Sequence, residues 1–138
     1  MTIEGSAQVA CRPSWSELRA RAKVFRLAHV AWGVVSMAAL AVIWRSVITD
    51  HRDRVLAASV AWLSVEGAAL IVGRGDCPMG PMQRSLGDPV PMFELVLPQR
   101  AAKAAVPVLA AVTAAGFAGV ALRLAASLRA PRVGRTGR

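Results

Sequence analysis

The chain has 138 residues, a formal net charge of +9 and a hydrophobic content of 55%. Its mean hydropathy of +0.46 is higher than that of an ordinary soluble domain of this size. The basic residues stand at the ends of apolar runs and in the tails, where lipid headgroups would meet them. The positive charge therefore indicates a membrane lipid partner and no nucleic acid.

Three long apolar stretches predict an all-α integral membrane protein with about three transmembrane helices. They comprise residues 27–44, 55–73 and 104–122 and are almost free of charge. A helix rises about 1.5 Å per residue and the hydrocarbon core is about 30 Å thick, so each stretch is long enough to cross it. A soluble helical bundle is the alternative, but its helices would carry polar stripes, and Thr113 is the only polar residue of the third stretch. The predicted membrane domain covers residues 27–122.

The segments outside this domain are polar or amphipathic. Residues 1–13 are expected to be a disordered tail, and residues 123–138 a basic, mobile tail. The spacing of Ser14 and Glu17 matches a capping box, which predicts an amphipathic interfacial helix over residues 14–26, lying on anionic lipid. A simple N-terminal extension of the first span explains the same residues equally well.

The distribution of basic residues predicts the orientation. Abundant Arg, Ala and Val are typical of a GC-rich bacterial genome, so we expect a multi-pass protein of the plasma (inner) membrane. Five basic residues precede the first span and three follow it, namely Arg12, Arg19, Arg21, Lys23 and Arg26 against Arg45, Arg52 and Arg54. This imbalance favours a cytoplasmic N-terminus, although the basic C-terminal tail favours the reverse.

Two ionisable residues stand inside the first two spans. Pairing the helices about the middle of their short connection sets Glu66 level with Gly33, one turn from His29. A charge in hydrocarbon costs about 2.5 to 3.5 kcal/mol or more, so we expect His29 and Glu66 to form an intramembrane polar pair. The pair is either a proton- or ion-handling site or an interhelical hydrogen bond that fixes helix register. The second interpretation is favoured.

The connection of residues 74–103 is rich in Pro and Met. Cys77, Met79 and Met82 are soft ligands of the kind that suits Cu(I), which makes them weak candidates for a metal site. The same methionines suit an irregular apolar gap, and the Pro and Gly residues suit ordinary turns. No cofactor is predicted.

Small residues recur along the third span. Ala111, Ala115 and Gly119 repeat at four-residue spacing, which lets another helix approach closely. We therefore expect a membrane-protein partner or a homo-oligomer, and the leading function is a non-catalytic subunit or assembly partner in a membrane complex. The alternative is a small transporter, redox or metal-handling protein that uses Glu66, His29 and residues 77–82. No catalytic residues are predicted, and an enzymatic activity is not favoured.

The long connection contains a run of residues that resembles a known protein family. The run Cys77-Pro78-Met79-Gly80-Pro81-Met82, after an apolar helix with Trp62 and Glu66 and a first span with His29, resembles a family of small uncharacterised bacterial membrane proteins. That family is a domain of unknown function with a Cys-Pro-Leu-Thr-Pro-Leu-Glu signature after its second helix. Here Gly80 and Gln83 stand where the family has Thr and Glu. The resemblance covers residues 27–122 and implies a membrane fold but no activity.

Overall fold

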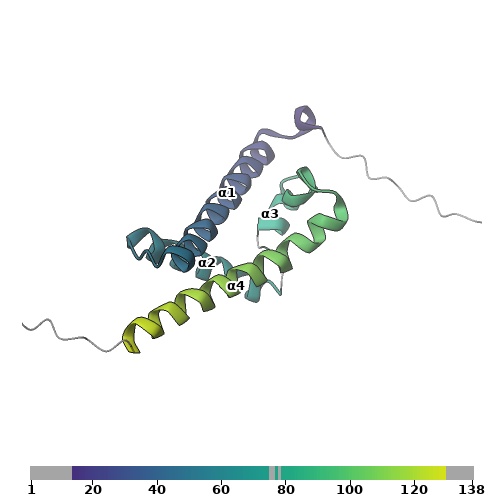
Figure 1. The fold of residues 1–138 in the computed structure, drawn as a ribbon. Helices are drawn as coiled ribbons and strands as arrows, with labels where there is room; N and C mark the ends of the chain where they lie inside the picture. Colours follow the sequence, from purple (N-terminus) through teal and green to yellow (C-terminus); the bar gives the residue numbers. More distant parts are fainter. Residues whose placement is uncertain (1–13, 75–76, 78, 130–138) are drawn as a thin grey trace, which may run out of the picture.

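A computed structural model describes residues 14–74, 77 and 79–129, and the secondary structure of this part of the chain consists of helices and turns, without a strand (Figure 1). The predicted disordered tail and most of the predicted basic tail lie outside the described residues. The elements are the 3₁₀ turn η1 (Trp15–Glu17), α1 (Ala20–Thr49), α2 (Arg54–Val72), α3 (Met79–Ser85), the 3₁₀ turn η2 (Met92–Leu95) and α4 (Gln99–Arg129).

Three of these helices, α1, α2 and α4, are long and apolar enough to cross a membrane, which confirms the predicted all-helical class and the number of candidate spans. Helix α2 lies within one residue of its predicted bounds at each end. Helices α1 and α4 have 30 and 31 residues and extend well beyond the predicted stretches. Helix propensity continues into the polar flanks, whereas hydropathy reports only the apolar middle of each helix.

The N-terminal segment differs from the separate interfacial helix predicted over residues 14–26. The backbone N–H of Ser14 donates to Glu17 at 2.6 Å, as a capping box requires, but the turn that follows ends after three residues. The chain is extended at Leu18, and α1 then runs unbroken from Ala20 into the first apolar stretch. Residues 20–26 are thus the N-terminal extension of the first span.

Helices α1 and α2 form an antiparallel hairpin closed by four residues. Asp50 adopts the left-handed conformation that ends α1, with its N–H donating to the Ser46 carbonyl at 2.9 Å. The carboxylate of Asp53 then caps α2 by accepting from the Leu56 N–H at 2.8 Å. The core of the hairpin consists of buried apolar side chains of both helices: Ala39, Leu40, Ile43, Leu56 and Leu63.

Helix α4 packs on the second half of α1 through two glycines. A Cβ at Gly116 would lie 2.9 Å from Ile43 Cγ2, and one at Gly119 would lie 2.9 Å from Val47 Cγ2. The contacts advance in the same direction along both helices, so α1 and α4 run parallel. Only residues without a Cβ allow the two backbones to approach this closely.

The connection between α2 and α4 folds back between the helices. Figure 1 shows α3 beside the first half of α1, on the side that faces the beginning of α4. Met92 of η2 reaches α1, because its sulfur and terminal methyl group lie 3.2 Å from the position that a Cβ of Gly33 would occupy. A flexible methionine thus fills the space between helices that diverge from their contact at Gly116.

Candidate functional site

The most extensive polar site of the described residues joins the beginning of α1 to the long connection. We call Arg26, His29, Gln83 and Asp88 the anchoring cluster. All four side chains are buried, with 8% of Arg26 and of His29, 3% of Gln83 and none of Asp88 exposed. Polar groups this deep must be hydrogen-bonded, since an unpaired one would cost a large part of a small protein's stability.

Local structure at the end of α3 directs Asp88 into this cluster. Gly87 takes a positive φ of 88°, which only glycine adopts without strain. The N–H groups of Gly87 and Asp88 then donate to the carbonyls of Arg84 and Gln83, at 3.0 and 3.1 Å, forming a Schellman motif. This reversal places the Asp88 carboxylate next to the side chain of Gln83.

The Asp88 carboxylate is held by four donors. Arg26 of α1 makes two parallel hydrogen bonds to it, one from Nε at 2.6 Å and one from Nη2. Gln83 Nε2 donates at 2.8 Å, and the Val90 N–H donates at 3.3 Å. The Asp88 carboxylate therefore fixes the loop to the helix through one charged, two-pronged pair and two neutral donors.

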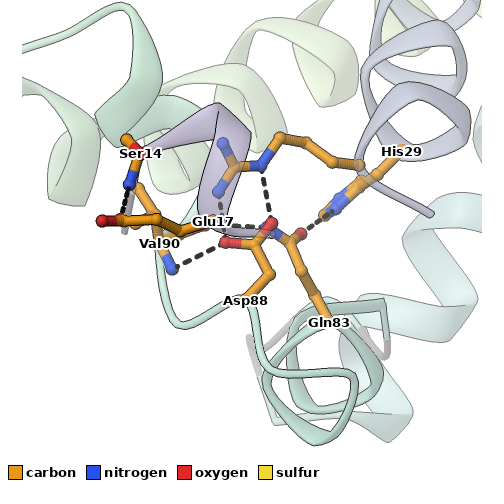
Figure 2. Close-up of polar contacts among 7 residues, drawn as sticks. Ser14, Glu17, His29, Gln83, Asp88 and Val90 are labelled. Carbon is orange, nitrogen blue, oxygen red and sulfur yellow. Dashed lines mark hydrogen bonds and ion pairs between the residues drawn. The ribbon is translucent and has the colours of Figure 1, made fainter. Parts of the chain in front are cut away.

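Gln83 defines the role of His29. Its Nε2 group donates to both Asp88 and the Val90 carbonyl, at 2.8 Å each, so its Oε1 atom must face the other way. Figure 2 shows Gln83 between Asp88 and His29, with dashed contacts on both sides. His29 Nδ1 lies 2.8 Å from Oε1 and must carry the hydrogen, since an amide oxygen only accepts.

Two opposing effects set the pKa of Asp88. Its burial would raise the pKa, because a buried carboxylate loses its hydration. The hydrogen bonds from Arg26, the Val90 backbone and Gln83, together with the positive charge of Arg26, outweigh this effect and hold the pKa below its ordinary value. Asp88 is therefore an anion that the fold stabilises, and its role in this cluster is that of a structural counter-ion.

A second, smaller polar group lies deeper between α1 and α2. Ser36 Oγ donates to Glu66 Oε2 at 2.7 Å and accepts from Trp62 Nε1 at 3.1 Å. The Trp62 ring also stacks at a tilt on Trp32, with 4.2 Å between ring centroids. Glu66 thus ties α2 to α1 through Ser36, a contact that fixes the register of the two helices.

The structure does not bring His29 and Glu66 together. His29 bonds to Gln83, and Glu66 bonds to Ser36, about two helical turns further along α1. The predicted register was wrong by about one turn, because Glu66 lies level with Ser36 instead of Gly33. Helix α1 continues to Thr49, so the midpoint of the hairpin falls later in the chain than residue 50.

The remaining predicted site residues lie in two places, the segment at α3 and the helix α4. Cys77 is a free, half-buried thiol, and Met79 and Met82 follow it on α3, where 55% of Met82 is exposed. No group of three His, Cys, Asp or Glu side chains capable of holding a metal occurs in the described part of the chain. The Cu(I) site at Cys77, Met79 and Met82 stays a prediction. On α4, Gly119 packs against Val47, whereas Ala111 and Ala115 are exposed.

The anchoring cluster was not predicted from the sequence as a unit. Arg26 was predicted only as part of a possible interfacial helix over residues 14–26, and His29 was paired with Glu66. One signal was present: Asp88 is the only acidic residue between Cys77 and Phe93, a mainly apolar segment whose other polar side chains include Gln83 and the basic Arg84. A lone acid in such a segment requires a cationic partner.

Comparison of the sequence with protein-family models, with curated proteins and with solved structures gave no match. The resemblance to the family with the Cys-Pro-Leu-Thr-Pro-Leu-Glu signature therefore stays a prediction.

Proposed function

We propose that this chain is a multi-pass protein of the bacterial plasma membrane and serves as a non-catalytic subunit that docks on another membrane helix through α4. The observation that carries the proposal is the composition of the exposed face of α4. Its side chains in the middle of the helix are small: Ala110, Ala111, Ala114, Ala115 and Ala118 are all exposed. A helix that faces only lipid has no need of such a face, whereas helices that pack closely use it.

The contacts among the described residues leave this face free. Helix α4 meets α1 through Gly116 and Gly119, and only Ala102 and Gly116 of its 31 residues are buried. The hairpin of α1 and α2 thus covers one side of α4. The opposite, alanine-rich side is the docking surface of the proposal, and either a different membrane protein or a second copy of this chain would fit it.

Enlarging the free face should abolish assembly without unfolding the chain. We expect Ala111→Leu/Ala115→Leu to lose the species that wild type forms on chemical cross-linking in native membranes, because leucine side chains keep a partner backbone at a distance. Both alanines are exposed, so the melting temperature of the purified variant in mild detergent should equal that of wild type. The mass of the cross-linked species distinguishes a homo-oligomer from a heteromeric complex.

The matched control is Ala57→Leu/Ala61→Leu. These two alanines have the same spacing and are exposed on α2. The control should keep the cross-linked species at the level of wild type. Equal amounts in both double variants would contradict the proposed docking surface, and so would wild type that forms no such species.

The proposed orientation has the N-terminus and the α2–α4 connection in the cytoplasm. In spheroplasts, a membrane-impermeant thiol reagent should therefore leave Cys77 unlabelled in a chain carrying Cys11→Ser, and should label it after permeabilisation. Ser127→Cys, introduced near the opposite end of α4 in a chain without Cys11 and Cys77, should be labelled in intact spheroplasts. The reverse pattern would invert the orientation, and labelling of both sites would contradict the membrane crossing of α4.

A further inference from the structure

Two adjoining hollows lie between the first turns of α1 and the end of α3. The first, of about 480 Å³, is lined by Arg19, Ala20, Arg21, Ser85 and Leu86. The second, of about 450 Å³, is lined by Ala20, Arg21, Val24, Phe25, Ala28 and Leu86. The two hollows share Ala20, Arg21 and Leu86 as lining residues and so adjoin each other; together we call them the groove.

The groove has a charged end and an apolar end. At the first end stand Arg19 and Arg21, both exposed, and neither pairs with an acidic side chain of the described residues. Toward the other end the walls are Val24, Phe25 and Ala28. From Ala20 to Ala28 the helix rises about 12 Å, so the apolar part follows α1 toward the middle of the candidate span.

We infer that this groove binds one anionic phospholipid. The guanidinium groups of Arg19 and Arg21 match the phosphate of its headgroup, and the apolar walls match the first part of an acyl chain. The order of the two ends agrees with the order in a bilayer, because Arg19 precedes the uncharged stretch that begins at Leu27. A soluble anion would use only the charged end, and a neutral lipid only the apolar end.

The anchoring cluster keeps the two walls of the groove together. Leu86 lies between Gln83 and Asp88, both of which bond to α1 or to each other. Arg26 takes no part in the groove, because its guanidinium is hydrogen-bonded to Asp88. The lipid site therefore uses two exposed arginines of the groove and excludes Arg26, which is buried and paired with Asp88.

Native mass spectrometry of the full chain in mild detergent can test the site. The probe is phosphatidylglycerol added at increasing concentration, with phosphatidylcholine as the zwitterionic comparison. Each arginine near an anionic lipid contributes about 1 kcal/mol, so Arg19→Gln/Arg21→Gln should weaken the binding of phosphatidylglycerol roughly ten- to thirty-fold. The matched control, Arg123→Gln/Arg129→Gln, removes the same charge at the far end of α4 and should bind as wild type does.

Two further arms separate the sources of an anionic group and the contribution of the apolar wall. Glycerol phosphate, which has the headgroup without acyl chains, should not displace the lipid at equal concentration. Val24→Asn should weaken phosphatidylglycerol binding while Arg19 and Arg21 are intact. If Arg19→Gln/Arg21→Gln and Arg123→Gln/Arg129→Gln weakened phosphatidylglycerol binding equally, the effect would be one of overall charge, and the inference would be overturned. Displacement by glycerol phosphate, or unchanged binding by Val24→Asn, would overturn it as well.

Discussion

Replacing Asp88 with Asn should destabilise the protein by about 3 to 5 kcal/mol, because the buried guanidinium of Arg26 would lose its counter-ion. The side chain of Arg26 is 10% exposed and that of Asp88 is fully buried, so water cannot replace the lost charge. The thermal unfolding of the purified protein in mild detergent, followed by circular dichroism, measures the effect.

Asp50→Asn is the matched control for this substitution. Asp50 also pairs with an arginine, Arg52, at 2.8 Å, but 51% of its side chain is exposed. An exposed pair contributes at most about 1 kcal/mol, and asparagine tolerates the left-handed conformation at this position. Similar losses in the two variants would contradict the assignment of Asp88 as a buried counter-ion. The double variant Arg26→Met/Asp88→Leu should recover part of the lost stability, since it leaves no unpaired charge.

Acid should weaken the same cluster. The pKa of Asp88 in the folded protein is below its value in the unfolded chain, so the unfolded chain binds the proton more readily. The contribution of Asp88 to stability is therefore complete above the unfolded pKa of about 4 and is lost as the pH falls through the lower, folded value. When the pH is lowered below about 4, the unfolding temperature of wild type should decrease more than the unfolding temperature of Arg26→Met/Asp88→Leu.

Replacing Gly116 with Leu should separate α4 from α1 and reduce stability by about 1 to 3 kcal/mol, the usual range for overpacking a closed interface. Even the first carbon of the new side chain would lie 2.9 Å from Ile43 Cγ2. Ile43 is completely buried, so it has no free space into which to move. Thermal unfolding in detergent again provides the measurement.

Gly67→Leu separates this steric effect from the change in helix propensity. Gly67 is also a glycine inside a candidate span, but nothing lies within 4 Å of the position of its Cβ. Leucine is a better helix former than glycine by up to about 1 kcal/mol, so Gly67→Leu should equal wild type or exceed it in stability. A loss of stability in Gly67→Leu as large as that in Gly116→Leu would show that bulk in a span is harmful wherever it is placed.

The spans could be predicted from the sequence because length and hydropathy are local properties. Residues 55–73 satisfy both criteria without reference to the rest of the chain, and α2 begins and ends one residue earlier. The pairing of α1 with α2 was less certain, since it depends on where one helix stops. The left-handed Asp50 ends α1 five residues beyond the apolar stretch that finishes at Trp44. Because the turn lies later in the chain than predicted, Glu66 pairs with Ser36 and is not level with Gly33.

The anchoring cluster could not be predicted because its members are far apart in the chain. Arg26 and Asp88 are separated by 62 positions, and their contact depends on the end of α3 and the reversal at Gly87. Neither residue belongs to a motif of fixed spacing. The sequence indicates that each charge needs a partner, but only the folded connection decides which partner is within reach.

The separation of Arg26 from Asp88 has a consequence for biosynthesis. A ribosome adds about 5 to 20 residues per second, so Arg26 is added to the chain roughly 3 to 12 seconds before Asp88. The rest of the hairpin is made within that interval, since α2 ends at Val72, and the guanidinium of Arg26 has no Asp88 carboxylate to pair with until the interval ends. Arg26 directly precedes the uncharged stretch that begins at Leu27, so its long side chain can keep its charge hydrated at the end of that stretch. The buried pair of Arg26 and Asp88 can therefore form only after the connection between α2 and α4 has been made.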